Sequence, residues 1–372
     1  MQNLGYVLLI AYNVIFFYKF WKMPHTNHTS ELGTTFYPQW VWMGRQLKKL
    51  KLPFRDDIYY KYPASIPFLS TFYPIHFLTS LTENFNVLHY SILSHFILGS
   101  SIAYYLFLQW CHPLVALFGA ITLFYSGYCI KVQQPCIVYT MAWIPGIFLD
   151  GWFGVLSMTM TLLGGYYPIL VYLIPFILIV HTKTVLLGIL LALPQIIPFL
   201  VYYLKSVRLG EMVNQQYGKI PLKKLTELFL PIRKHQHTNG VFYMEMAMYM
   251  GFLPFLFMWE SGSRFWIVLI YGLSVCVGWL KPIQRIPARA LYIVTLSITI
   301  LAADGLNKLG LRNELLIMVL ILQGTMLLFN RDIYPCYPFT QWWNSDWEKM
   351  DYTGYLRGSS KNGYYKGAFA LK

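Results

Sequence analysis

The stretch VLHYSILSHFILGSSIAYYLFL, residues 87–108, holds 22 residues and no charged side chain. The hydrocarbon core of a bilayer is about 30 Å thick, and a helix of about 20 apolar residues crosses it. Similar stretches recur along the chain, and only 12% of its residues are charged, about half the share that is usual in soluble domains. The sequence therefore predicts an all-α, polytopic membrane protein rather than a soluble protein with buried helices.

Outward from this stretch, we expect eleven transmembrane helices, all within one domain at residues 1–329. The segment GYVLLIAYNVIFFYKFW (5–21) has no small-residue cleavage site, so it is expected to be a retained first span. Three polar stretches remain: a first loop at 21–86, a second loop at 205–241 and an aromatic-rich tail at 330–372. The expected spans are 4–20, 87–108, 112–128, 137–150, 152–165, 167–181, 184–204, 242–259, 264–280, 288–304 and 312–329.

The first loop carries a predicted amphipathic helix, Tyr37–Leu50, which Pro53 ends. Trp40 and Trp42 suit the lipid headgroup layer, and the basic residues that follow them suit phosphates or water. Two prolines interrupt the apolar segment SIPFLSTFYPIHFLTSL (65–81), so it is expected to be re-entrant or interfacial rather than spanning.

The formal net charge is +14, and 25 of the 29 basic residues fall on the face of the bundle that carries both loops and the tail. The positive-inside rule would make this face cytoplasmic, although a face that binds anionic lipid phosphates would also be basic. The chain shows no nucleic-acid motif, so membrane lipids are the expected partners. Its five cysteines form no CxxC pair and predict neither a disulfide framework nor a metal site.

A series of short motifs, in order from residue 28 to 310, resembles the bacterial YfhO-like membrane proteins of the GT-C glycosyltransferase superfamily. ELGTTFYP places Glu31 seven residues before Pro38, where the family has an acid and a proline. The family's Leu-Pro pair, Phe-Tyr-Pro element and Trp-x-Pro element are similar to Leu52-Pro53, FYPIHFL (72–78) and AWIPGIFL (142–149). Later motifs are similar to LLGGYYPIL (162–170), LLALPQIIPFL (190–200) and RIPARALYIV (285–294). Two features depart from the family: its acid is usually aspartate, and its members are commonly longer.

The resemblance implies a GT-C-like fold with an extracytoplasmic first loop, in the bacterial cytoplasmic membrane, and transfer of a sugar from a polyprenyl-phosphate carrier to an envelope polymer or lipid. It implies Glu31 as the general base, with Asp56 and Asp57 as alternatives. For the phosphate we expect Arg289 and Arg285, then Arg208 and Lys131, since arginine grips phosphate oxygens bidentately. Candidates for substrate binding are Glu245, Tyr73 and Trp40. No cofactor is expected, and a divalent metal is left open because only some GT-C enzymes use one.

Each of these residues also has a structural interpretation. Asp56 and Asp57 could be a solvated pair neutralised by Arg55 and Lys61, and Arg289 could extend to lipid headgroups. The chain as a whole has two rival interpretations: a non-catalytic scaffold subunit of a larger membrane complex, and a secondary transporter. An inverted repeat would favour the transporter, and none is evident.

Overall fold

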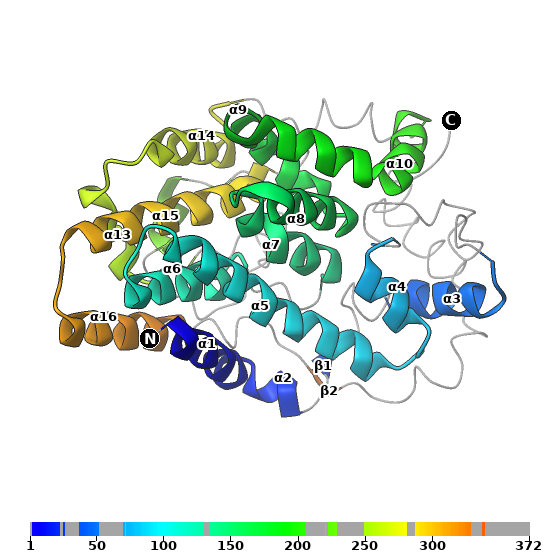
Figure 1. Cartoon of the computed structure of the whole chain (residues 1–372), viewed down its shortest axis with the longest axis horizontal. Helices are drawn as coiled ribbons and strands as arrows, with labels where there is room; N and C mark the ends of the chain where they lie inside the picture. The colour runs from blue at the N-terminus through cyan, green and yellow to red at the C-terminus, as the bar shows by residue number, and fades with distance from the viewer. Residues whose placement is uncertain are drawn as a thin grey trace.

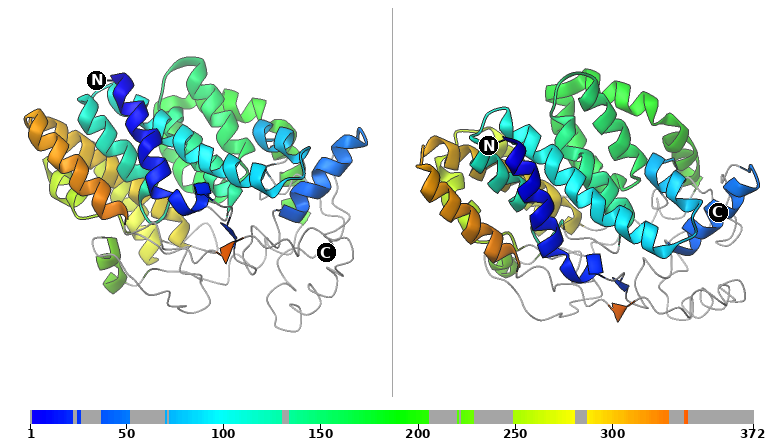
Figure 2. Two further views of the ribbon diagram at one scale, coloured as in Figure 1. Left: turned by 90° about the horizontal axis from the view of Figure 1, so that it is seen from below. Right: turned by 60° about the horizontal axis from the view of Figure 1, so that its bottom comes forward.

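The computed structural model shows a bundle of helices (Figures 1 and 2). It describes residues 2–22, 25–26, 37–51, 70, 72–129, 134–205, 220, 222–228, 249–280, 287–328 and 337–338. These residues are helical apart from short connections and one two-residue pair, in which β1 (His25–Thr26) lies antiparallel to β2 (Tyr337–Pro338). The predicted all-helical class is therefore confirmed, and the tail is joined to the start of the first loop.

The N-terminal helices are α1 (Gln2–Phe16), α2 (Tyr18–Lys22), α3 (Tyr37–Lys48) and α4 (Pro74–Ser80). Helix α3 is the helix predicted in the first loop, and it lies beside α4 (Figure 1). Gly44 allows this approach, since a Cβ there would meet the Ser80 carbonyl oxygen at 2.0 Å.

Glu83 closes the α3–α4 pair by accepting from Lys48 at 2.7 Å and from Arg45 at 3.1 Å. Burial alone would raise the pKa of Glu83, but these two hydrogen bonds lower it below its ordinary value. The basic end of α3 thus binds a carboxylate of its own chain.

The next helices, α5 (Phe85–Leu108), α6 (Pro113–Tyr125), α7 (Pro135–Ile147) and α8 (Gly151–Leu163), begin within two residues of the predicted spans. Their starts follow local chemistry, because the Asn84 side chain caps α5 and a proline occupies the first turn of α6 and α7. Helices α6 to α8 have 13 residues each, so each is only about 20 Å long at 1.5 Å per residue.

Helices α9 (Tyr167–Leu191) and α10 (Leu193–Lys205) are divided differently from the prediction. The predicted boundary at 181–184 is a kink inside α9, where His181 has non-helical backbone angles, and the chain turns again at Ala192. The segments His181–Leu191 and Leu193–Leu200 meet at 75°. Pro194 explains the second break, because a proline cannot donate to the preceding turn and disfavours helix in the residue before it.

The C-terminal part comprises η3 (Leu222–Leu228), α13 (Leu253–Phe257), η4 (Met258–Glu260), α14 (Phe265–Val277), η5 (Pro287–Ala290), α15 (Leu291–Lys308) and α16 (Asn313–Leu327). The predicted span 242–259 was wrong in its described part, which holds only a five-residue α-helix and one short 3-10 turn. Gly251 has a φ of +81°, a left-handed conformation that a continuous helix cannot contain.

Of the described helices, α5 and α15 are long and apolar enough to cross a membrane, and the bent pair around Ala192 would be a third. The count of eleven spans is therefore not confirmed. The distribution of polarity nevertheless suits a lipid environment, because large apolar side chains are exposed along α1, α14 and α16 while uncharged polar ones are buried. Exposed examples are Val7, Ile15, Ile267, Ile270, Met318 and Ile321; buried examples are Asn13, Thr122, Gln195 and Gln323.

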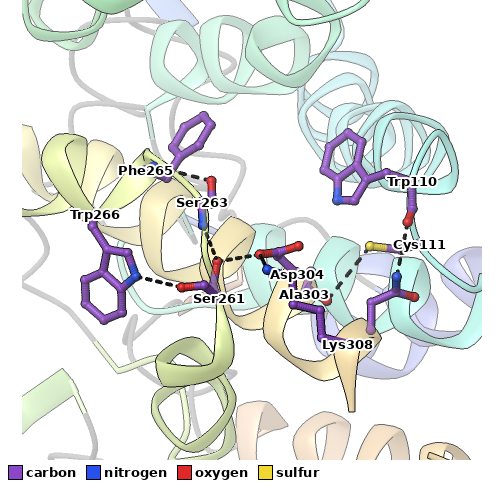
Figure 3. Close-up of polar contacts among 10 residues, drawn as sticks. Trp110, Cys111, Ser261, Ser263, Phe265, Trp266, Ala303, Asp304 and Lys308 are labelled. Atoms are coloured by element: carbon purple, nitrogen blue, oxygen red, sulfur yellow. Dashed lines mark hydrogen bonds and ion pairs between the residues drawn. The ribbon is translucent and has the colours of Figure 1, made fainter. Parts of the chain in front are cut away.

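One end of the bundle, which we call the Asp304 end, is held by polar side chains near the C-terminus of α15 (Figure 3). Asp304 accepts from the Ser261 hydroxyl at 2.6 Å and from Lys308 at 3.0 Å. Asn307 accepts from the His112 backbone N–H at 2.8 Å and donates to the Trp110 carbonyl at 3.2 Å. The end of α15 thereby fixes the turn between α5 and α6 and the turn before α14.

Candidate functional site

The candidate site lies at the other end of α15, around Tyr166, and we call it the Tyr166 end. Arg289 precedes α15 and Asp304 lies near its C-terminus, a separation of about 22 Å along the helix axis. Of the ten predicted site residues, the structure describes Tyr73, Trp40 and Arg289. Glu31, Asp56, Asp57, Lys131, Arg208, Glu245 and Arg285 lie outside the described residues.

Tyr73 directly precedes α4 in the first loop and is fully buried. Its hydroxyl lies 2.7 Å from Nε2 of His95 in α5 and accepts from Nε1 of Trp143 in α7, also at 2.7 Å. Its ring stacks on that of Tyr139, with centroids 4.8 Å apart and planes 10° apart. Burial is the main cause that raises the pKa of the Tyr73 hydroxyl, so this group is a neutral donor and acceptor and not a base.

Gln195 in α10 holds the same segment from the other side and is also fully buried. Its Oε1 accepts from the backbone N–H of Phe72 at 3.2 Å, and its Nε2 donates to the Leu163 carbonyl at 3.1 Å. An amide side chain in an apolar helix is costly unless both of its polar atoms find partners. Gln195 satisfies both by joining the exit of the first loop to the end of α8.

The turn between α8 and α9, residues 164–166, is the point where these elements meet. The Ser70 hydroxyl donates to the Gly164 carbonyl at 2.6 Å, and the Tyr166 N–H donates to Oγ1 of Thr140 at 3.0 Å. Gly164 has no room for a side chain, since a Cβ there would lie 2.7 Å from the backbone nitrogen of Thr140. Gly165 has a φ of +85°, which favours glycine. The sequence GGYYP is thus explained by this turn.

Arg289 reaches the same turn from η5. Its guanidinium carbon lies 5.4 Å from the centroid of the Tyr166 ring, and its backbone carbonyl accepts from the Tyr128 hydroxyl at 3.4 Å. The Arg289 side chain is half-buried while the Tyr166 ring is almost fully buried. The predicted residue Arg289 and Ser70, three residues before the predicted residue Tyr73, therefore both contact this turn.

Trp40 is the third predicted site residue that the structure describes. It was expected in the headgroup layer, but it is buried with the core side chains of α3. Sequence reasoning assigned no role to Tyr166, His95, Trp143 or Gln195. The available signal was an uncharged polar or aromatic polar residue within an apolar helix, which has to find a partner inside the protein.

Arg289 is the predicted phosphate-binding residue that the structure describes. Arginine presents in-plane N–H donors that match phosphate or carboxylate oxygens, and partial burial strengthens such contacts. No aspartate or glutamate is among the buried polar residues that the structure describes. Within these residues, no three His, Cys, Asp or Glu side chains gather as metal ligands would.

No family model matches the chain, and no curated protein or solved structure matches it significantly.

Proposed function

We propose that this protein is a multi-pass membrane glycosyltransferase of GT-C type, which moves a sugar from a polyprenyl-phosphate carrier to an envelope polymer or lipid. In this proposal the protein resides in a bacterial cytoplasmic membrane, Glu31 is the general base, and Arg289 binds the phosphate. The observation that carries it is that Arg289 and Ser70 of the first loop contact the same turn, residues 164–166.

Transfer from a lipid phosphate leaves a phosphate behind, so a cation in a partly dry site stabilises the departing group. Arg289 is such a cation: the Tyr128 hydroxyl binds its backbone carbonyl, and the Tyr166 ring supports its guanidinium. The apolar side chains exposed on the bundle supply the lipid contact that a polyprenyl donor needs.

The test is mass spectrometry of envelope glycans and lipid-linked sugars from a deletion strain and its complements. The complements carry the wild type, Glu31→Gln, Arg289→Gln or Arg312→Gln at equal protein abundance. Arg312 is the matched control, because it is exposed at the start of α16 beside the Asp304 end. We expect the deletion, Glu31→Gln and Arg289→Gln to lose the same sugar and Arg312→Gln to keep it. Unchanged glycans in every strain contradict the proposal.

A non-catalytic scaffold subunit is the second candidate. It is favoured by the Tyr73 cluster, in which the described hydroxyl, indole and imidazole groups bind one another and contain no acid. This candidate predicts stable co-purification of partner membrane proteins and full complementation by both Glu31→Gln and Arg289→Gln. Loss of a sugar in either variant excludes it.

A further inference from the structure

We infer that Tyr166 is a positioning residue, which holds the Arg289 guanidinium in the orientation that binds the phosphate of a lipid ligand. The inference rests on the proposed phosphate role of Arg289 and adds the residue that sets its geometry. Tyr166 itself is not assigned a contact with the ligand.

The first step is the contact between the two side chains. A guanidinium 5.4 Å from an aromatic centroid is within the range of a cation–π interaction, which is worth about 2- to 30-fold in an equilibrium constant. The N–H donors of arginine lie in the plane of the guanidinium. A ring that supports this group therefore limits the directions in which its donors can meet an oxygen.

The second step is the rigidity of the support. The Tyr166 backbone N–H is bound to Oγ1 of Thr140, and the same hydroxyl donates to the Thr161 carbonyl at 3.3 Å. The Tyr166 ring is 2% exposed, so neighbouring side chains fix it on nearly all sides. A long arginine side chain loses conformational entropy when it binds a ligand, and a rigid platform removes part of that loss in advance.

The third step concerns the Arg289 backbone, which the Tyr128 hydroxyl holds through its carbonyl oxygen. Tyr128 follows α6 and Tyr166 precedes α9, so two elements that are distant in sequence fix the two ends of one arginine. A surface arginine that only extends to headgroups does not require such a double support.

The experiment measures binding of farnesyl phosphate, with farnesol as the probe that lacks phosphate, to the full chain in phosphatidylcholine nanodiscs by isothermal titration calorimetry. The variants are Arg289→Gln, Tyr166→Leu and Tyr166→Phe. Tyr167→Leu is the matched control, since the neighbouring Tyr167 ring packs on Phe199, with centroids 4.8 Å apart.

We expect the wild type to bind farnesyl phosphate more tightly than farnesol, and Arg289→Gln to abolish this difference. Tyr166→Leu should weaken farnesyl phosphate binding about 2- to 30-fold and leave farnesol binding unchanged. Tyr166→Phe keeps the ring and should retain wild-type affinity, and the control Tyr167→Leu should keep the wild-type difference between the two probes.

Three results overturn the inference: equal binding of both probes by the wild type, wild-type affinity in Tyr166→Leu, or equal loss in Tyr166→Phe and Tyr166→Leu. The proposed function fails separately. If the Tyr166 variants behave as expected while envelope glycans stay unchanged in the Arg289→Gln strain, the phosphate site stands and the transferase proposal falls.

Discussion

The hydroxyl of Tyr73 lies 2.7 Å from Nε2 of His95, and the direction of this hydrogen bond follows from the neighbours. The Trp143 indole is a donor only, so it donates to the Tyr73 oxygen. The Ser91 carbonyl beside Nδ1 can only accept, so Nδ1 carries the imidazole proton and Nε2 accepts the Tyr73 hydroxyl proton. Nδ1 thus donates to the Ser91 carbonyl at 2.5 Å. The chain Trp143 to Tyr73 to His95 to Ser91 runs in one direction.

The Tyr73→Phe substitution breaks this chain in the middle. It leaves a buried indole N–H and a buried imidazole nitrogen without the partner they have in the wild type, at a cost of about 1–3 kcal/mol for each unsatisfied group. We expect a lower free energy of unfolding and faster hydrogen exchange in residues 72–81, measured in detergent micelles by denaturation and mass spectrometry. Tyr105→Phe is the control, because Tyr105 is 49% exposed. Equal stability of the two variants contradicts the directional chain.

The close approach at the Asp304 end predicts different effects for two glycines. A Cβ on Gly305 would lie 1.9 Å from the Phe257 carbonyl oxygen, whereas one on Gly262 would meet only the flexible end of Lys308, at 3.2 Å. Gly305→Ala should therefore force α15 and the α13–η4 segment apart and cost about 1–3 kcal/mol. Gly262→Ala should change the midpoint of thermal unfolding little. If Gly305→Ala lowers the midpoint of thermal unfolding less than Gly262→Ala does, α15 and the α13–η4 segment are not packed in this way.

Cys111 lies in the turn between α5 and α6 and predicts a pH dependence. Burial raises the pKa of the Cys111 thiol to about 12, and the nearby Asp304 charge contributes in the same direction. The reactive species is the thiolate, so maleimide labelling of the native protein should stay slow from pH 7 to pH 9. Trp110→Cys, at a position that is 42% exposed, should label rapidly in the same buffer. If Cys111 in the wild type reacts as fast as position 110 does in the Trp110→Cys variant, the thiol of Cys111 is not buried in this turn.

The sequence predicted those helices whose signals are local. The start of α5 depends on an asparagine cap and α6 and α7 begin at prolines, so their bounds could be predicted within a few residues. The span 242–259 could not, because its composition is apolar apart from Glu245 while Gly251 has a left-handed backbone that interrupts a helix. Apolar composition predicts a membrane span, but this glycine decides where the helix begins.

The site was predicted less completely, for a different reason. Tyr73 and Arg289 were predicted as site residues, but the residues that orient them are distant in sequence. His95 and Trp143 are 22 and 70 residues from Tyr73, and Tyr166 is more than 100 residues from Arg289. Which polar side chain meets which depends on the packing of α5, α7 and the α8–α9 turn. A single sequence shows that such residues need partners and does not show the partners.

The positions of exposed tryptophans predict the depth of the Asp304 end in a membrane. Trp110 before α6, Trp152 in the first turn of α8 and Trp259 in η4 are 42%, 77% and 69% exposed. Tryptophan prefers the headgroup layer, so spin labels at these three positions should share one shallow depth in oxygen and nickel accessibility measurements. Labels at Ile270 and Met318, within α14 and α16, should lie deeper in the hydrocarbon. Equal water accessibility at all five positions contradicts a membrane-embedded bundle.

The last prediction concerns the two sides of the membrane. The β1–β2 pair joins residues 25–26 to residues 337–338, so the first loop and the tail belong to one side. Reporter fusions at residues 50 and 372 should therefore agree, and the proposed transfer from a polyprenyl phosphate requires both to be extracytoplasmic. A fusion at Gly310, beside the Asp304 end and with open space around its Cβ, should report the opposite side. If residues 50 and 372 both report cytoplasmic, the excess of basic residues on the face predicted to carry both loops and the tail sets the orientation, as the positive-inside rule requires, and extracytoplasmic sugar transfer at Arg289 is excluded.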